Sequence, residues 1–354
     1  MMAEDTVKVG LVGAGGNTRL RHIPGFQQMS GVIVDSVCNR SLESGKKVAD
    51  EFGIEKIYDN WIDVMDDPEN DAVCIGTWPY MHCTLVLAAL ESGKHVMTEA
   101  RMSTSAAEAH IMLEASRNYP DLITQIVPSP MTLNLDKTIK GLISDGYLGD
   151  ILSVDVSVAQ GAGQSGFVDK TKPFHWRQSR DFSGFNIMGL GIWYEALMRW
   201  VGPAASVQAL TRITVPSRKD ESGELQVISV PDHVEILCEM FSGPITHIRF
   251  TDVLGHAPGN AVWIYGTEGT LHIDGSATTN LKLFGGRKSD SELSEIAIKP
   301  ELQGGWRVEE EFINAIRGAE EISHTTFEDG VRYMEFTEAV TRSSQSGEKI
   351  YLPL

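Results

Sequence analysis

The stretch Val7-Lys-Val-Gly-Leu-Val-Gly13-Ala-Gly15-Gly16-Asn17-Thr18 decides the fold of the first part of the chain. Its first six residues predict a buried strand, and the glycines that follow predict a tight turn into a helix. Gly13 and Gly15 match the first two glycines of the G-x-G-x-x-G pattern: the first allows the turn, and the second lets backbone approach a pyrophosphate at the helix N-terminus. Thr18 replaces the third glycine, which serves close packing of the helix on the strand. We therefore predict a dinucleotide-phosphate loop made of Gly13, Gly15, Gly16, Asn17 and Thr18.

Strands alternate with helices from this loop to about residue 127. Four further apolar runs predict strands over residues 33–38, 72–76, 95–97 and 123–127, with helical patterns such as 85–92 and 105–118 between them. Such alternation indicates βαβ units and a parallel sheet, so the fold class is α/β. Pro128-Ser129-Pro130 breaks the pattern, and we place a domain boundary there: a dinucleotide-binding domain over 1–128 and a second domain over 129–354.

The second domain has a different pattern. A helix over 133–144 and a strand over 151–158 are followed by a strongly apolar helix over about 186–201. Six short strand patterns lie between residues 206 and 284, and two helical patterns, 307–317 and 327–343, close the chain. Runs of strands followed by helices predict an α+β domain with a large, mostly antiparallel open sheet.

The end of the second predicted strand carries no acidic residue, because Cys38 is followed by Asn39, Arg40 and Ser41. NAD-binding folds usually place Asp or Glu near this point to hold the ribose 2′-hydroxyl, whereas a nearby Arg accommodates a 2′-phosphate. Asn39 does not repel a phosphate, and Arg40 and Ser41 can bind one. The alternative is that Arg40 is a solvated turn residue. We favour NADP(H) over NAD(H).

The composition excludes several classes of partner. Lys and Arg number 30 against 48 Asp and Glu, which gives a formal net charge of −18 and argues against binding to nucleic acid or to an anionic membrane surface. There is no apolar run long enough for a membrane span, and neither a CxxC pair nor a His/Cys cluster that suggests a metal site. We expect a cytoplasmic protein with reduced cysteines that acts on a small molecule.

Several segments together resemble the glucose–fructose oxidoreductase / inositol dehydrogenase / MocA family, across essentially the whole chain. These segments are the glycine loop followed by Arg21-His22 and Pro24, then Asp71–Thr77 with His82, Ala88–Met97, Gly191-Ile192, Gly266–Asp274, and Phe327–Gly330 with Gly347–Leu352. The resemblance implies a Rossmann domain, a C-terminal domain whose open sheet supports homo-oligomers such as dimers or tetramers, a nicotinamide cofactor, and sugar or polyol substrates.

The positions that carry the family's chemistry are altered. The family's Glu-Lys-Pro reads Glu99-Ala100-Arg101, so its usual lysine is Ala100. Its D-x-G-x-H helix motif begins at Gly189 and ends at Trp193, so the aspartate and the general-base histidine are absent. Oxidation of an alcohol requires a group that removes the hydroxyl proton, and a positioned base contributes a factor of about 10²–10⁴. The resemblance still assigns Glu99 to cofactor binding.

Three nearby residues are candidates to replace the lost base. Tyr194 and Glu195 follow the altered histidine position, and Glu195 is either functional or one half of a structural pair because it lies in an apolar segment. His175 lies in Phe174-His-Trp-Arg177, a segment that in the family borders the substrate cleft, and its alternative role is a hydrogen bond within the loop. The candidate substrate contacts are Arg101, Trp176, Arg177, Arg180, Asp181 and Trp193.

The loop after the third predicted strand completes the expected cofactor site. Thr77 and Trp78 follow the carboxyl end of that strand, where an open parallel sheet binds its dinucleotide, and we interpret His82 as structural. We therefore expect an NAD(P)(H)-dependent oxidoreductase acting on a carbohydrate, polyol or related hydroxylated molecule with a non-standard acid/base group. Two alternatives remain: a redox-neutral glycoside-cleaving or eliminating enzyme with a retained cofactor, and a non-catalytic dinucleotide-binding sensor or partner subunit.

Overall fold

The computed structural model describes residues 6–159, 166–275 and 281–354, and the chain divides into two compact units. The first unit comprises Met1–Pro128 and Arg307–Val331; the second comprises Ser129–Trp306 and Arg332–Leu354. The first break lies between Pro128 and Ser129, within the Pro-Ser-Pro segment. The return of 307–331 to the first unit is a feature that the sequence patterns do not reveal.

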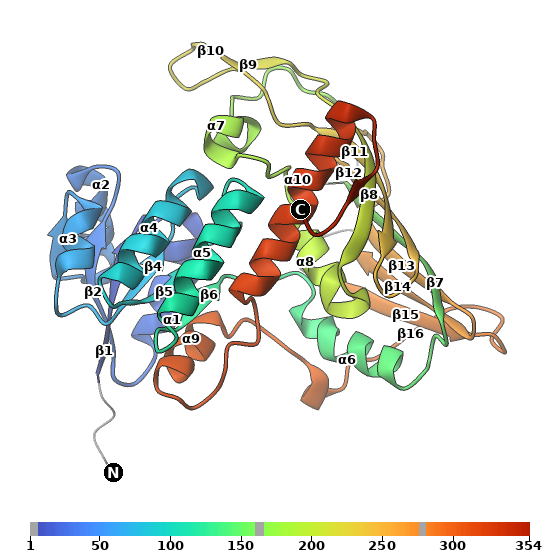
Figure 1. Ribbon diagram of the computed structural model, residues 1–354, viewed down its shortest axis with the longest axis horizontal. Coiled ribbons are helices and arrows are strands. Elements are labelled where there is room, and N and C mark those ends of the chain that lie inside the picture. The colour runs from blue at the N-terminus through green and yellow to red at the C-terminus, as the bar shows by residue number, and fades with distance from the viewer. Residues whose placement is uncertain (1–5, 160–165, 276–280) are drawn as a thin grey trace. The chain divides into compact units, whose positions relative to one another are not determined.

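The first unit contains a six-stranded parallel sheet in the order β3-β2-β1-β4-β5-β6 (Figure 1). The order reverses between β1 and β4, so a crevice for a ligand is expected outside the carboxyl ends of these two strands. The strands are β1 (Val7–Val12), β2 (Val32–Cys38), β3 (Lys56–Tyr58), β4 (Ala72–Ile75), β5 (His95–Thr98) and β6 (Thr124–Ile126).

Helices connect these strands. Three of them begin at a polar residue whose side chain accepts a hydrogen bond from a backbone N–H in the first turn: Ser41, Asn60 and Ser105. The last helix comes from the far end of the sequence and packs against α1. The helices are η1 (Thr18–His22, of π type), α1 (Ile23–Gln27), α2 (Leu42–Phe52), α3 (Trp61–Asp66), α4 (Pro79–Glu91), α5 (Ala106–Asn118) and α9 (Val308–Ile316).

The second unit is built on a nine-stranded sheet in the order β16-β15-β14-β13-β7-β12-β11-β8-β17. All neighbouring pairs are antiparallel except β7 with β12, which confirms the predicted mostly antiparallel sheet. Its strands are β7 (Ile151–Ala159), β8 (Ala204–Arg212), β11 (His233–Met240), β12 (Ile245–Thr251), β13 (Asn260–Gly266), β14 (Gly269–Gly275), β15 (Lys282–Arg287), β16 (Ser294–Glu295) and β17 (Ile350–Tyr351). A separate hairpin pairs β9 (Ser217–Lys219) with β10 (Leu225–Val227).

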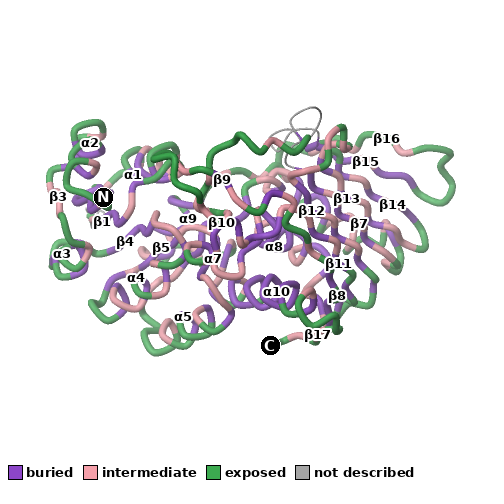
Figure 2. The backbone as a smooth tube through the Cα atoms, turned by 90° about the horizontal axis from the view of Figure 1, so that it is seen from above, coloured by how far each residue is buried: buried purple, intermediate pink, exposed green. Residues whose placement is uncertain are grey.

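Buried and more exposed residues alternate along β7, β11 and β13, as expected for a sheet with one covered face (Figure 2). The apolar helix α8 supplies part of the cover, and its Tyr194 stacks on Phe336 of α10 with ring centroids 3.6 Å apart. The helices are α6 (Leu133–Ser144), η3 (Trp176–Gln178), α7 (Arg180–Ser183), α8 (Leu190–Val201), η4 (Pro300–Leu302) and α10 (Phe327–Ser346), the last beginning in the first unit. Among the described residues, no helix is long and apolar enough to cross a membrane.

Candidate functional site

The carboxyl ends of β1 and β4 approach each other through glycine backbone. Gly13 has a φ of +85°, and a Cβ atom there would lie 2.8 Å from the Thr77 backbone nitrogen. A Cβ atom on Gly76 would overlap the Gly13 carbonyl oxygen. Gly15 and Gly16 are exposed, so their backbone is accessible to a ligand. The two strand ends therefore meet backbone to backbone beneath an accessible loop, so a ligand can approach the loop backbone closely.

Thr18 fits this loop because of Gly76. The threonine is buried, its hydroxyl donates to the Gly13 carbonyl at 3.3 Å, and a side chain at position 76 would overlap its Oγ1 atom. The missing third glycine of the sequence pattern is thus compensated on the neighbouring strand. The helical segment that Thr18 begins continues without interruption through η1 and α1 to Gln27.

The end of β2 places Asn39 against the same loop. The Asn39 side-chain oxygen accepts the Ala14 backbone N–H at 2.6 Å, so this residue shapes the loop. Arg40 is exposed, and Ser41 caps α2 by accepting the Ser44 N–H at 3.3 Å. A cationic side chain and a helix N-terminus therefore lie where the sequence predicts recognition of the adenosine ribose.

His82 joins the two loops that follow β4 and β5. Its ring nitrogens lie 2.9 Å from the Arg101 carbonyl oxygen and 3.0 Å from the Thr77 carbonyl oxygen. The ring is fully buried, and burial lowers its pKa. These contacts favour the structural interpretation of His82. Trp78, the residue before α4, packs edge-on against Tyr80 with ring centroids 6.4 Å apart.

Glu99 follows β5 and belongs to a buried charged network that the sequence analysis missed. Its Oε1 atom accepts the Asn17 side-chain amide at 2.5 Å and lies 3.0 Å from Nε2 of His22. The other ring nitrogen of His22 lies 2.5 Å from Glu309 Oε1 on α9. The network thus joins the predicted cofactor residues Asn17 and Glu99. Arg21-His22 contributed to the family resemblance, but nothing in the local sequence indicates Glu309.

The surroundings of Tyr194 disfavour a role in proton transfer. Its ring is 1% exposed, its hydroxyl accepts the Ala204 backbone N–H at 2.7 Å, and burial raises its pKa far above neutrality. A phenol enclosed in this way cannot reach a substrate. Tyr194 is a core residue of the second unit.

Glu195 is one half of a structural pair. Its carboxylate lies 3.0 Å from Nη1 of Arg199, one helical turn on, and accepts the Ser129 backbone N–H at 2.8 Å. Arg199 also lies 3.0 Å from the Asp136 carboxylate, so one guanidinium holds two buried acids. Of the two roles left open for Glu195, these contacts favour the structural one.

His175 is exposed at the start of η3, where its Nδ1 atom accepts the Arg177 backbone N–H at 3.3 Å. Burial by its surroundings and the nearby Arg177 charge lower the pKa of His175, which keeps the ring neutral at pH 7. In that form the proton is on Nε2. The Arg177 guanidinium lies 4.2 Å from the centre of the Trp176 ring.

The other predicted substrate contacts have different surroundings. Arg180 is fixed inside the second unit, because its Nε atom donates to the Ser229 carbonyl at 3.1 Å. Asp181 is exposed in the first turn of α7, whereas Trp193 and Arg101 are buried at 4% exposure each.

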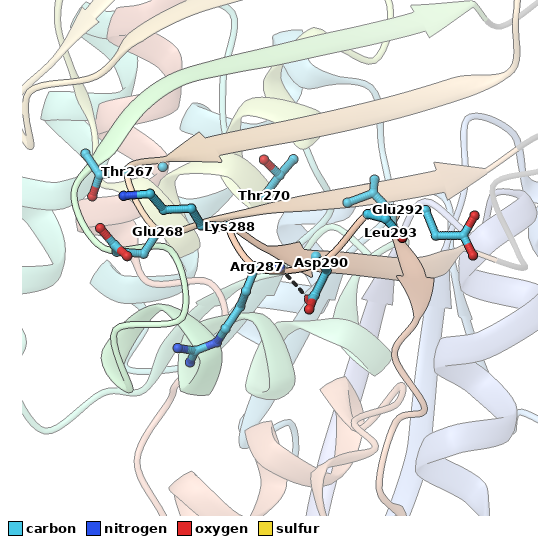
Figure 3. A pocket seen from close by; sticks show the side chains of 12 residues that line it. Thr267, Glu268, Thr270, Arg287, Lys288, Asp290, Glu292 and Leu293 are labelled. Atoms are coloured by element: carbon cyan, nitrogen blue, oxygen red, sulfur yellow. Dashed lines mark hydrogen bonds between the residues drawn. The ribbon is translucent and has the colours of Figure 1, made fainter.

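A cavity of about 430 Å³ lies elsewhere, at one end of β14 and β15 in the second unit (Figure 3). Its charged lining combines Arg287 and Lys288 with Glu268, Asp290 and Glu292, so neither sign dominates. Asp290 accepts the Arg287 backbone N–H at 2.8 Å, and the Arg287 guanidinium lies over the ring of Tyr147. No residue that the sequence predicts for the site lines this cavity.

Two family models match the chain. The model described as "Oxidoreductase family, NAD-binding Rossmann fold" covers residues 7–124, and the GFO/IDH/MocA C-terminal domain model covers residues 137–272. Among curated relatives, the levoglucosan dehydrogenase of Pseudarthrobacter phenanthrenivorans is 24% identical over 246 residues, 65% of this chain and 62% of the relative. The trans-1,2-dihydrobenzene-1,2-diol dehydrogenase of Mus musculus is 24% identical over 283 residues, 80% of this chain and 78% of the relative.

Solved structures share the fold over the full length. Levoglucosan dehydrogenase in its apo form superposes with a TM-score of 0.85 at 21% identity, covering 99% of both chains. The WlbA dehydrogenase from Bordetella pertussis, solved with NADH and UDP-GlcNAcA, superposes with a TM-score of 0.80 at 21% identity and covers all of both chains.

Proposed function

Because the chain belongs to the GFO/IDH/MocA oxidoreductase family, we propose that it transfers hydride between NADP(H) and a hydroxylated small molecule of the carbohydrate or polyol class. The observation that carries this proposal is the close approach of Gly13 and Gly76 at the carboxyl ends of β1 and β4, where the strand order reverses. The named substrates of the relatives, levoglucosan and a dihydrobenzene diol, are both compounds with hydroxyl groups. When bound, the nicotinamide supplies the hydride acceptor or donor; the protein binds and orients both partners.

The preference for NADP(H) is supported by the end of β2. Asn39 carries no charge and its oxygen is engaged by the Ala14 amide, while Arg40 is exposed beside the N-terminus of α2. A guanidinium that contacts a phosphate forms a charge-assisted hydrogen bond. The Arg40→Ala variant should bind NADPH about ten- to a hundred-fold more weakly and NADH unchanged.

The matched control for this test is Lys46→Ala, which removes an equal charge from an exposed position on α2, the helix that Arg40 precedes. Titration of cofactor fluorescence measures both affinities. Equal binding of NADH and NADPH by the unmodified protein, or an equal loss of both in Arg40→Ala, would rule out the preference for NADP(H).

His175 is our proposed acid/base group. It is exposed and neutral at pH 7, and its Nε2–H is available to hydrogen-bond the reacting oxygen, whereas Tyr194 is enclosed and Glu195 is engaged by Arg199. Arg177 and Asp181 are proposed substrate contacts because both are exposed near His175 in the sequence. His175→Ala should lower kcat by about 10²–10⁴. His175→Gln should not recover that loss, because its amide can donate a hydrogen bond but cannot transfer a proton near pH 7.

The function itself is tested by hydride transfer. Purified protein should change NADPH or NADP⁺ absorbance with at least one member of a panel of sugars, polyols and the corresponding ketones. Tight cofactor binding with no transfer in either direction would favour the sensor alternative, which the altered positions Ala100, Gly189 and Trp193 also suggest. Product formed without added cofactor, from protein that retains its nucleotide, would favour the redox-neutral alternative.

We also propose that the chain forms a homo-oligomer through the partly exposed face of the nine-stranded sheet. Trp263, His272 and Phe284 on three neighbouring strands stack in a row across it, with Trp263 and His272 centroids 3.8 Å apart. Leu210, Leu237 and Ile245 on β8, β11 and β12 are more than half exposed. A second copy would cover this apolar area. Light scattering of Trp263→Glu should show a smaller particle than the unmodified protein; a monomeric parent would refute the proposal.

A further inference from the structure

The His22 imidazole is fully buried between carboxylates from two other elements of the first unit. Glu99 stands at the end of β5, and Glu309 lies in the first turn of α9. The Nε2–Oε1 distance to Glu99 is 3.0 Å, and the Nδ1–Oε1 distance to Glu309 is 2.5 Å. Each ring nitrogen therefore faces a carboxylate acceptor, which is the arrangement of a doubly protonated imidazolium, and the Asn17 side-chain nitrogen also lies 3.3 Å from Nε2.

Charge in the surroundings favours that protonated form. Burial alone would lower the pKa of His22, but the hydrogen bonds to Glu309 and Glu99 outweigh it and raise the pKa to about 9. Burial would likewise raise the pKa of Glu99, but His22 and the Asn17 amide lower it. The thiol of Cys74 on β4 also faces the two carboxylates, and their charge and its burial raise its pKa, so it stays neutral.

The site is shaped to hold this arrangement. A Cβ atom on Gly25 would lie 2.9 Å from the carboxyl carbon of Glu309, so the absence of a side chain on α1 leaves room for this carboxylate. Within the described ranges, no group of three or more His, Cys, Asp or Glu side chains has metal-binding geometry.

The network reaches the phosphate loop through Asn17. This residue precedes η1, and its side-chain amide donates to Glu99 Oε1 at 2.5 Å. Ionised Glu99 thus lies directly behind the loop that should receive a pyrophosphate, where its charge opposes that ligand. A positive charge on His22 cancels part of this repulsion and holds Glu99 toward Asn17.

We propose that His22 is a positioning residue for the dinucleotide: as an imidazolium it fixes Glu99 behind the phosphate loop and partly neutralises the negative charge that the pyrophosphate meets there. This inference rests on the proposed function, since it needs a dinucleotide in the crevice. By thermodynamic linkage, a proton on His22 and a bound dinucleotide must each favour the other.

The first test compares NADPH affinity in the full-length protein, His22→Gln and a control, His110→Gln, at an exposed position on α5. His22→Gln should bind NADPH about ten-fold more weakly at pH 7.5, and the control should match the parent. The parent should also lose affinity as pH rises through about 9, whereas His22→Gln should lack this step. Equal affinity of parent and His22→Gln from pH 6 to 10 would overturn the inference.

The second test uses the unmodified protein, so it decides the matter even if His22→Gln fails to fold. NMR titration of labelled histidine should show one ring that stays protonated to about pH 9, and NADPH should raise that pKa further. A pKa for this ring that is unchanged by saturating NADPH would overturn the inference. Failure of the parent to bind any dinucleotide would instead refute the proposed function, so the two failures are distinguishable.

Discussion

Tyr194 illustrates how the surroundings of one side chain decide its chemistry. Its hydroxyl accepts the buried Ala204 N–H, and its ring stacks on Phe336. Tyr194→Phe should destabilise the protein by about 1–3 kcal/mol, because the amide loses its acceptor, while leaving kcat nearly unchanged. Urea unfolding measures the change in stability, and steady-state kinetics measure kcat. A loss of kcat of a hundred-fold in a variant that folds normally would return Tyr194 to the catalytic residues.

His22 should make stability depend on pH. Its folded-state pKa of about 9 lies above the ordinary value of 6.5, so its protonated form is favoured by folding. The contribution, on the order of 3 kcal/mol, is fully present below pH 6.5 and is lost as pH rises through about 9. The difference in unfolding free energy between the parent and His22→Gln should shrink between pH 6.5 and 9.5. A difference that stays constant over this range would contradict the assigned charge.

At the scale of elements, Gly76 holds the ends of β1 and β4 together. Gly76→Ala should abolish NADPH binding or prevent folding, because the new Cβ atom would overlap the Gly13 carbonyl and the Thr18 hydroxyl. The control is Gly141→Ala, in the interior of α6, where a new Cβ atom meets nothing within 4 Å. This substitution should stabilise the helix by about 0.5–1 kcal/mol. Calorimetry would measure the stability of each variant, and cofactor titration would measure its NADPH affinity. Unchanged NADPH binding by Gly76→Ala would disprove the close approach of Gly76 to Gly13 and Thr18.

Elements with a strong periodic pattern are the ones that sequence reasoning predicted. The strand over 7–12 and its glycine turn were predicted with the observed bounds, and the apolar helix predicted from residue 186 begins at Leu190. The short strands β3, β16 and β17 carry too few side chains to show a period of two and were missed, whereas the equally short β6 lies in the apolar run over 123–127 that was predicted. The partners of His22 and Glu195 were also missed, since Glu309 lies 287 residues from His22 and Ser129 lies 66 from Glu195.

At the scale of the whole molecule, the first unit needs residues from both ends of the sequence. Gln125 donates to Glu311 at 2.7 Å, and Ile126 and Thr325 exchange two backbone hydrogen bonds. A fragment of residues 1–128 should therefore unfold at lower urea than the first unit does in the full chain, and should bind NADPH more weakly. A peptide of residues 307–331 supplied in excess should restore part of both properties. A fragment that by itself unfolds at the same urea concentration and binds NADPH as tightly as the full chain would show that α9 is dispensable.

The distance in sequence between His22 and Glu309 also has a consequence for synthesis. At translation rates of about 5–20 residues per second, the ribosome needs roughly 15–60 s to add the 287 residues that separate them. During that interval the phosphate loop and its helix have emerged, but the buried histidine lacks one of its two carboxylates and α1 lacks the helix that covers it. The first unit therefore cannot complete its fold until the end of the chain is made, and we expect the surface that α9 later covers to favour aggregation during that interval.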